Sequence, residues 1–559
     1  MKDMKVHTTF TMMFLLLASG LFAQSKREGL LLLTDRGHYI SGETIFYKAL
    51  YRGPGEVGSE NWSKILYVEL VMPNGSSLDQ HKIILDPQGG KGKLNIPEGI
   101  SSGTYYLKAY TRWMRNCGPE AFSYTSIQVY DTYKESVLPV DSTGWEAASP
   151  QQLISEPGLH SEDVLECILE KSNLQTREKV HLNLTWKFPD TPSNVTLSVA
   201  KAGLQGNQQY INPGCQISGE QETSFLPETQ GLSLTGQAVG SVDRLPAAYA
   251  TIYVSVLGEE REFFCNYSDS SGRFYFSFPG YVDERDLFVS TFHPEYEDLD
   301  LLIDRDFNND QIYLPSHPIH LNDTLASTIT EMSVNFQVSQ QYYPPEIQKV
   351  EVEKGDGRLF YGNPTATVKF DDFVNLPRLE EYFIEVVPQV AVRKTKGERR
   401  FVVLGEHPDL NIYQPLVMID GVAIFDVEAV LDVSPRLIDR VEIINAPYIR
   451  GNVTFGGIIS IISRNNDLGY IDLPSSGLLV NYQMLDLPID SSHLSASMDQ
   501  RLPDVRNTLY WNPGVEIQPD ETRQFTFSTA DASGDYEILI RGIDSAGNYF
   551  SKTVPFRVE

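Results

Sequence analysis

The chain has 559 residues, of which 41% are hydrophobic and 21% are charged, so its composition is that of folded protein and its length predicts several domains. Asp and Glu outnumber Lys and Arg by 74 to 45, which gives a formal net charge of −29. This balance argues against nucleic-acid binding, which needs a basic surface, and against electrostatic docking on anionic lipid.

The N-terminal segment predicts export. Lys2 and Lys5 precede an apolar run with small residues at its end, which is the pattern of a secretory signal peptide over 1–23. No Cys follows this run, so lipid attachment is not indicated. No later run approaches about 18 apolar residues, so the sequence predicts no direct membrane span. We expect an exported protein that is soluble or is held at a membrane by a partner.

Four cysteines follow, and their spacing leaves their pairing open. Cys117, Cys167, Cys215 and Cys265 lie far apart and form no C-x-x-C motif. Export permits disulfides, so Cys215 and Cys265 are a candidate pair. The alternative is that all four remain separate thiols.

Residues 25–132 predict an antiparallel β-sandwich. Turn signals separate six strand-like runs, at 45–50, 65–71, 82–85, 94–96, 105–110 and 123–130. The stretch TDRGHYISGET (34–44) resembles the opening strand and turn of the second macroglobulin domain of alpha-2-macroglobulin-like proteins. IPEGISSGTYYLKAYTRWMRN (96–116) is similar to a segment of their bacterial exported relatives. The resemblance implies an immunoglobulin-like sandwich, and a polar linker with several prolines follows it over 133–164.

The next strand-like runs are too few for a domain of their own. Three runs lie within 165–205, and four more lie within 505–559. Neither set can bury both faces of a sheet alone, and seven strands complete a sandwich, so we expect the two segments to form one split domain. TLYWNP and FTFSTADASGDYEILIRGID in the second segment resemble the strands with which macroglobulin-like chains resume after an insertion.

Two insertions and a helix lie within that split domain. GLSLTGQAV, PAAYATIYVSV, SDSSGRFYFSFP and DLFVSTFHP, all within 231–305, resemble the carboxypeptidase regulatory-like domain, a small transthyretin-like sandwich whose name implies no peptidase activity. A connecting helix is predicted over 322–342 by apolar residues at helical spacing: Leu325, Ile329, Met332 and Phe336.

Residues 360–468 predict a compact α+β unit. Three short apolar runs indicate strands: 416–419, 441–444 and 458–462. The last run is apolar on both faces and is therefore expected to be covered on both. Asp426 can cap one short helix, and another is predicted over 376–387. The order IDGV, short helix, DRVEII and FGGIISIIS resembles the plug domain of TonB-dependent outer-membrane receptors.

The resemblance implies a plug without its own barrel. A receptor barrel has many strands, each of about 9–11 residues, and the residues after Arg464 are too few to encode it. By the same resemblance, we expect plug loops and arginines to contact a partner: Asp420, Gly421, Arg436, Arg440, Arg450, Gly451, Phe455, Gly456, Gly457 and Arg464. The other interpretation is that the glycines only permit tight turns between strands.

The sequence carries no motif for catalysis or for a cofactor. The Gly-Cys-Gly-Glu-Gln thioester of macroglobulin traps, the G-x-S-x-G elbow, H-E-x-x-H and the P-loop are all missing, so we expect neither enzymatic activity nor a cofactor. His317 and His320 could offer two imidazoles, but no Cys is near them. One calcium loop is a candidate, because four oxygen-bearing residues alternate: Asp304, Asp306, Asn308 and Asp310. Asn309 and Pro315 stand where such loops carry Gly and Glu, so a solvated acidic loop is the alternative.

Three functions are compatible with these features. The first is an exported, non-enzymatic binding or assembly module of a Gram-negative outer membrane, on the periplasmic side in preference to the cell surface, whose plug-like domain contacts an outer-membrane protein such as a β-barrel receptor. The second is a barrel-less subunit of a TonB-dependent nutrient transporter, although the stretch SKREGLLLL supplies no obvious TonB-contacting box. The third is a protease-trap-like macroglobulin relative without a thioester.

Overall fold

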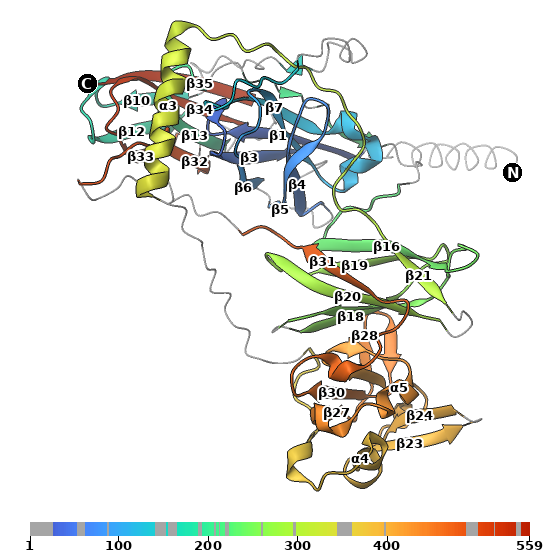
Figure 1. Cartoon of the computed structure of the whole chain (residues 1–559). Helices are drawn as coiled ribbons and strands as arrows, with labels where there is room; N and C mark the ends of the chain where they lie inside the picture. The colour runs from blue at the N-terminus through green and yellow to red at the C-terminus, as the bar shows by residue number, and fades with distance from the viewer. Residues whose placement is uncertain are drawn as a thin grey trace, which may run out of the picture. The chain divides into compact units, whose positions relative to one another are not determined.

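The computed structural model describes residues 26–559 except 53–61, 87–88, 140–152, 155–164, 188–192, 206–207, 209, 212, 218–222, 259–260, 294–297, 344–359, 396–397, 488–500, 519 and 544–548. The predicted signal peptide and most of the predicted 133–164 linker lie outside the described residues. The fold is mainly β, with antiparallel sandwiches and one α+β body, as the sequence predicts (Figure 1). None of the helices in the described ranges is long and apolar enough to cross a membrane.

The chain divides into two compact units, each built from segments that are far apart in the sequence. Unit 1 comprises Met1–Gly231, Phe307–Ile347 and Leu485–Glu559, and unit 2 comprises Leu232–Asp306 and Gln348–Met484. The two insertions predicted from the sequence are thus the two segments of unit 2.

The first sandwich of unit 1 has two sheets, with the strand orders β15-β1-β3-β6 and β5-β4-β7-β8-β14-β9, and β2 pairs with β8. Its first eight strands are β1 (Lys26–Thr34), β2 (His38–Ile40), β3 (Thr44–Arg52), β4 (Ile65–Val71), β5 (Ser77–Ile84), β6 (Gly90–Asn95), β7 (Gly103–Tyr110) and β8 (Ser123–Tyr130). The six predicted runs overlap β3–β8, and β2 lies within the stretch 34–44 whose resemblance implies an opening strand, whereas β1 was not predicted as a run. Large buried tyrosines fill much of the interior, namely Tyr47, Tyr67, Tyr105, Tyr106 and Tyr110.

A later segment returns to this sandwich and is fixed there by a disulfide. β14 (Tyr210–Ile211) pairs with β8 and with β9 (Leu153–Ile154), and β15 (Cys215–Ile217) pairs with β1. Cys117, at the end of the 3-10 turn η1 (Trp113–Cys117), is bonded to Cys215, and η2 (Pro119–Ala121) follows. The candidate Cys215–Cys265 pair is therefore wrong, because the fold brings a different partner to Cys215 and leaves Cys265 as a buried thiol.

The second sandwich of unit 1 joins the two ends of the split region. One sheet has the order β10-β12-β33, and the other has the order β11-β35-β34-β13-β32. The strands are β10 (Leu165–Leu169), β11 (Asn173–Leu174), β12 (Lys179–Trp186), β13 (Ser193–Lys201), β32 (Thr508–Ile517), β33 (Thr522–Ser528), β34 (Gly534–Ile543) and β35 (Tyr549–Val558). Trp186, Leu197 and Ile538 belong to one shared hydrophobic core. This pairing agrees with the hypothesis of a single split domain.

A buried ionic cluster connects the two sandwiches of unit 1. Arg36 is 4% exposed and lies 3.2 Å from the carboxylate of Glu43 and 3.3 Å from that of Asp35. Each carboxylate also receives a hydrogen bond from the second sandwich: Thr508 donates to Asp35 at 2.6 Å, and Asn507 donates to Glu43 at 2.7 Å. A buried charge is costly unless it is paired. The cluster therefore favours one relative position of the two sandwiches, in which all of these pairs form.

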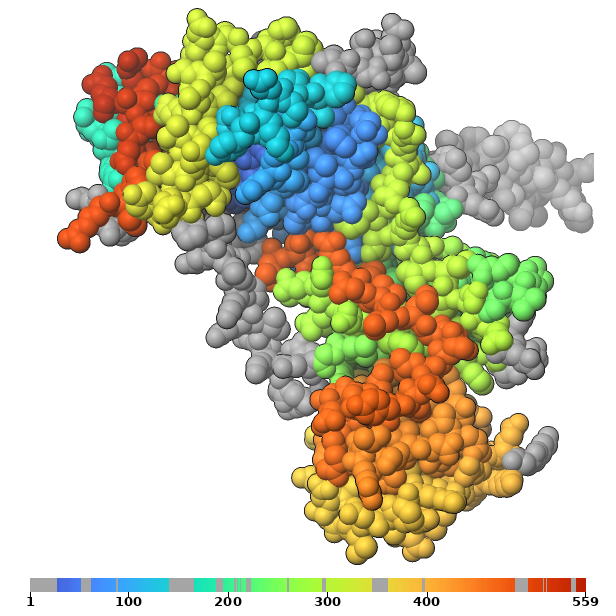
Figure 2. All heavy atoms as spheres, viewed as in Figure 1, coloured from blue at the N-terminus to red at the C-terminus, as the bar shows by residue number. Residues whose placement is uncertain are grey.

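Helix α3 (Asp323–Tyr342) is the helix that apolar spacing predicts over 322–342. The side chain of Asn322 accepts a hydrogen bond from the Leu325 amide at 2.8 Å and thereby caps the first turn. Ile329 and Met332 pack against Ile40 and Tyr130. In Figure 2 the atoms of α3 (yellow) lie between those of the first sandwich (blue) and those of the C-terminal strands (red).

Unit 2 begins with a sandwich of two sheets, ordered β19-β16-β21 and β18-β17-β20-β31. Its strands are β16 (Leu232–Gly240), β17 (Thr251–Val256), β18 (Glu262–Tyr267), β19 (Arg273–Phe278), β20 (Glu284–Phe292), β21 (Leu299–Ile303) and β31 (Leu478–Gln483). The sequence predicts a sandwich over 231–305, and the structure adds β31, which follows the α+β body in the chain and pairs with β20.

The rest of unit 2 is a compact α+β body around a five-stranded sheet of order β22-β27-β30-β25-β26. Its strands are β22 (Ala366–Lys369), β25 (Leu416–Ile419), β26 (Val422–Ala423), β27 (Ile438–Ile444) and β30 (Ile458–Ser463). All six residues of β30 are buried, as its apolar pattern predicts. Its short helices are α4 (Leu379–Glu385), α5 (Val427–Leu431) and the 3-10 turns η5 (Phe370–Asp372), η6 (Pro408–Asn411), η7 (Pro435–Leu437) and η8 (Leu468–Tyr470).

Two separate hairpins belong to the same body. They are β23 (Val390–Thr395) with β24 (Glu398–Val403), and β28 (Tyr448–Arg450) with β29 (Val453–Phe455). Neither pair joins the five-stranded sheet. The predicted cap of α5 is present, because the carboxylate of Asp426 accepts hydrogen bonds from the amides of Glu428 and Ala429.

Candidate binding surfaces

The Asp420–Gly421 turn between β25 and β26 is hydrogen-bonded to other parts of the α+β body. Asp420 is 3% exposed, and its carboxylate accepts hydrogen bonds from the amide and the hydroxyl of Ser463 at 2.9 and 2.5 Å and from the Leu468 amide at 2.9 Å. Both turn residues have positive φ, which explains the glycine at the second position. The carboxylate is therefore used within the body, and the expectation that Asp420 contacts a partner does not fit its burial.

The β28–β29 hairpin faces the chain's own sandwich. The Arg450 guanidinium donates to the Phe263 carbonyl at 2.7 Å and pairs with Glu262 at 3.1 Å, both on β18. A Cβ on Gly451 would lie 2.0 Å from the Cys265 carbonyl oxygen, so only glycine permits this approach. Phe455 is 6% exposed within an apolar cluster shared with the sandwich. Arg450, Gly451 and Phe455 are thus intramolecular contacts, which corrects the expectation of a free loop.

The two glycines after this hairpin are constrained by their own body. A Cβ on Gly456 would lie 2.2 Å from the Tyr413 carbonyl oxygen, and a Cβ on Gly457 would lie 2.6 Å from the Ile444 carbonyl oxygen. These positions therefore follow the alternative interpretation, in which the glycines permit close backbone packing.

The predicted arginines differ in whether their guanidinium groups form ion pairs. Arg440 is paired with Glu442 at 2.7 Å and with Asp439 at 2.9 Å, and Arg464 is paired with Asp371 at 2.6 Å. Arg436 is exposed, and its guanidinium has no ion pair among the residues that the structure describes. Of the four arginines predicted to contact a partner, Arg436 is thus the exposed one without an ion pair in the described ranges.

The candidate calcium loop distributes its side chains among different partners. Asp304 accepts a hydrogen bond from Thr235 at 2.5 Å and pairs with Arg273, while Asp306 accepts one from Tyr482 at 2.9 Å. Asn308 donates from its side-chain amide to Asp310 at 2.7 Å. No group of three or more His, Cys, Asp or Glu residues that could hold a metal occurs in the described part of the chain.

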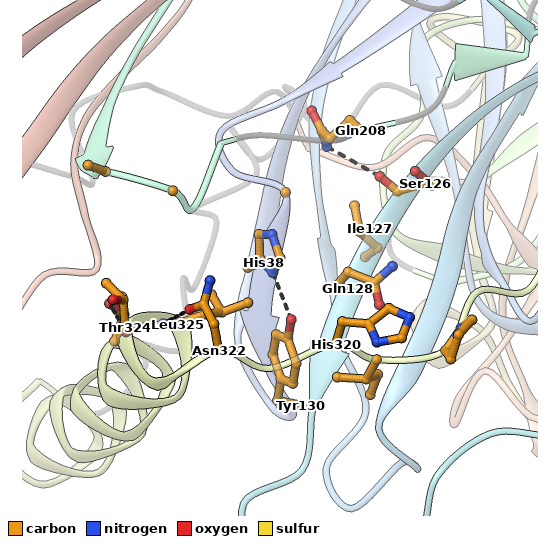
Figure 3. A pocket seen from close by; sticks show the side chains of 16 residues that line it. His38, Ser126, Ile127, Gln128, Tyr130, Gln208, His320, Asn322, Thr324 and Leu325 are labelled. Carbon is orange, nitrogen blue, oxygen red and sulfur yellow. Dashed lines mark hydrogen bonds between the residues drawn. The ribbon is translucent and has the colours of Figure 1, made fainter.

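A polar cavity of about 370 Å³ in unit 1 was not predicted from the sequence (Figure 3). His38 on β2 bonds through Nδ1 to the Tyr130 hydroxyl at 2.8 Å. Burial and the nearby Arg36 charge lower the pKa of His38 to about 4, so the imidazole is neutral at pH 7. Other polar side chains also line the cavity: Ser126, Gln128, Tyr130, Gln208, His320, Asn322, Thr324 and Thr328.

This cavity has the size and polarity to hold water or a small neutral molecule. It also places His320 of the considered His317–His320 pair, whereas the carbonyl oxygen of His317 accepts a hydrogen bond from Thr104. No periodic signal in the sequence brings these residues together, because strand β8, helix α3 and the segment before α3 supply them from distant positions.

Comparisons with known proteins identify no family for this chain. No protein-family model matches the chain, and no curated protein matches it. Among solved structures, the chain is similar to Escherichia coli alpha-2-macroglobulin activated by porcine elastase, with 9% identity, a TM-score of 0.23, and coverage of 95% of this chain and 44% of that one.

Two further solved structures align with similarly low identities and TM-scores. A Salmonella alpha-2-macroglobulin mutant aligns with 10% identity, a TM-score of 0.22 and coverage of 95% and 39%, and dimeric latent PorU from Porphyromonas gingivalis aligns with 8% identity, a TM-score of 0.15 and coverage of 50% and 33%. The chain spans less than half the length of these alpha-2-macroglobulins. Identities of 8–10% and TM-scores of 0.15–0.23 do not establish a shared fold or function for this chain.

Proposed function

We propose that the protein is an exported, non-enzymatic binding or assembly module associated with the outer membrane on its periplasmic side. In this proposal the α+β body at 360–468 corresponds to the plug-like domain and contacts a membrane protein partner. The protein acts by holding that partner and catalyses no reaction.

The observation that carries this proposal is that the α+β body is attached at two places to the sandwich of its own unit. The β28–β29 hairpin packs on β18 through Arg450 and Gly451, and β31 extends the sandwich sheet beside β20. The body is thereby held to the sandwich of its own unit at two places. A body attached in this way keeps its remaining surface in a fixed orientation. This favours binding, because less conformational entropy is lost when a partner docks.

The disulfide supports the proposed compartment. Cys117 and Cys215 are bonded and close a loop of sequence separation 98. Structural disulfides persist in oxidising compartments such as the bacterial periplasm and are rare in the cytosol. The bond is therefore consistent with export, which the signal-like segment at 1–23 predicts independently.

The attachment of the α+β body to the sandwich also restricts which surface is available to the partner. Asp420, Arg450, Gly451 and Phe455 are engaged internally, whereas Arg436 remains exposed. We therefore place the partner contact at the exposed surface around Arg436.

Site-specific photo-crosslinking in native outer membranes tests the proposal. A photoreactive residue at Arg436 is expected to capture a membrane protein in stoichiometric yield. A residue at Tyr133, which is 74% exposed on unit 1, is the matched control and is expected to give little of that product. Capture of a β-barrel would favour the transporter-subunit alternative or a receptor partner. Release of the protein by washing, with no membrane-protein adduct from Arg436, would contradict the proposal.

A further inference from the structure

The β23–β24 hairpin has one face that is directed toward the α+β body. Antiparallel pairing places three residue pairs on that face: Val390–Val403, Val392–Phe401 and Lys394–Arg399. The apolar members pack in or against the core of the body. Arg399 reaches Glu428 of α5 at 2.8 Å and Glu380 of α4 at 2.9 Å. On this face Arg399 is therefore balanced by acidic residues of the body.

The opposite face carries two arginines without such counterions. Arg393 and Arg400 are direct cross-strand partners, and both are exposed. Within the described residues neither guanidinium has a hydrogen bond or an ion pair, and Glu398, the acidic residue of the same face, pairs with neither. Like charges directly opposite each other destabilise a strand pair. The hairpin thus carries an unfavourable cation pair that a bound anion would relieve.

The stretch of sequence that contains this face is basic, unlike the chain as a whole. The stretch RKTKGERR at 393–400 holds five basic residues and one acidic residue, in a chain whose formal net charge is −29. Figure 1 shows the hairpin extending away from α4 and α5 of the body. An acidic partner would therefore meet favourable charge at the hairpin and repulsion over most other surfaces, which gives specificity of docking.

The chemistry of the partner follows from the number and geometry of these cations. Binding to anionic lipid generally uses about 4–8 clustered Lys or Arg residues, whereas the described outward face of the hairpin carries two, Arg393 and Arg400. A bilayer would also repel the acidic remainder of the chain. A carboxylate, in contrast, can accept hydrogen bonds from both guanidinium groups at once. The hairpin sheet has only two strands, so an extended segment can lie along it.

We propose that the outward face of the β23–β24 hairpin, formed by Arg393 and Arg400, docks an acidic extended segment of a partner polypeptide. A Glu or Asp carboxylate of that segment lies between the two guanidinium groups. This inference rests on the proposed function and deepens it by giving the chemistry of the partner's docking segment.

Fluorescence anisotropy of the full chain with a labelled peptide of alternating Glu and Thr tests the inference. Binding at low ionic strength is expected to weaken as salt is added. The Arg393→Glu/Arg400→Glu variant is expected to bind at least about tenfold more weakly, because it places like charges against the peptide. The Arg400→Glu variant alone creates an opposite-charge pair with Arg393, so it is expected to lose binding without a lower melting temperature.

The matched control changes the same net charge elsewhere on the body. Lys369→Glu/Arg378→Glu alters two exposed cations outside the hairpin and is expected to bind the Glu peptide within about twofold of the unaltered chain. Equal loss in the control, no binding by the unaltered chain, or tighter binding to phosphatidylglycerol vesicles than to the peptide would overturn the inference. Crosslinking from Arg436 is independent of these variants, so a failure here leaves the proposed function standing.

Discussion

The two hairpins of the α+β body differ in how their charges are matched. In β28–β29, Arg450 finds Glu262 and a backbone carbonyl on the neighbouring sandwich, and Gly451 allows the backbones to touch. In β23–β24, Arg399 is matched by two glutamates of the body, but Arg393 faces Arg400 across the strands. The first hairpin is therefore complete within the chain, whereas the second has an unmatched face.

The difference shows why a charged, glycine-containing loop cannot be assigned to a partner from its composition. Both hairpins carry arginines, yet one stabilises the fold and the other opposes its own strand pairing. Substitutions in the two hairpins are therefore expected to have effects of opposite sign on stability.

The largest effect is expected at Gly451. Gly451→Ala would place a methyl group 2.0 Å from the Cys265 carbonyl oxygen, at a residue with φ of +55°. We expect a loss of about 3 kcal/mol in the free energy of unfolding, from overpacking and backbone strain together. Urea unfolding followed by fluorescence measures it. Gly362→Ala is the control, because Gly362 has φ of +74° with no atom within 4 Å. An equal loss in both variants would mean that the contact with Cys265 is unimportant.

The next effect concerns a matched charge elsewhere, at His81 of unit 1. Its ring nitrogens lie 3.0 Å from Asp79 and 3.0 Å from Asp486. Burial alone would lower the pKa of His81, but the hydrogen bonds to Asp486 and Asp79 raise it to about 9. Because the folded pKa exceeds the unfolded value of 6.5, the stabilisation is fully present below about pH 6.5 and is lost as the pH rises through about 9.

His81→Gln is accordingly expected to cost about 2 kcal/mol near pH 6 and close to nothing near pH 10. Urea unfolding of both proteins at the two pH values measures this difference. A cost that does not change with pH would show that packing, and not the charge of His81, provides the stabilisation.

A smaller loss is expected at Arg450. Arg450→Ala removes the hydrogen bond to the Phe263 carbonyl and the pair with Glu262, which we expect to cost about 1–2 kcal/mol. Arg393→Ala, in the other hairpin, is the control and is expected to cost nothing or to stabilise slightly. If the two alanine variants had the same stability, the proposed contrast between the hairpins would be wrong.

The smallest effect is a gain at Arg400. Arg400→Glu replaces a like-charge cross-strand pair with an opposite-charge pair, which we expect to stabilise the protein by about 0.5 kcal/mol at low salt. The gain should decrease as salt is added, because the pair is exposed. Thermal unfolding at two salt concentrations measures it, and a lower melting temperature at low salt would contradict the prediction.

Much of the architecture follows from local sequence patterns. Strand-like runs between turn signals predicted β3–β8, helical spacing predicted α3, and Asp426 was recognised as a cap because capping depends on neighbouring residues only. The split sandwich could also be predicted from the sequence, because a strand count that is too small for a domain indicates that another segment completes it.

The remaining features depend on contacts between distant residues. Neither the Cys117–Cys215 bond nor the approach of Gly451 to Cys265 leaves a periodic signal in the sequence. β31 pairs with β20 although it lies beyond the whole α+β body, and its mostly exposed residues show no buried face. The basic run RKTKGERR was visible, but its importance appears only when the register places Arg393 opposite Arg400.

Photo-crosslinking from both hairpins in native outer membranes tests the central claim most directly. With a photoreactive residue at Arg450, the account predicts an intramolecular adduct with β18 and little product with other proteins. With the residue at Arg400, it predicts an adduct with a membrane protein. The opposite outcome, with a partner protein captured from position 450 and nothing captured from position 400, would contradict the account.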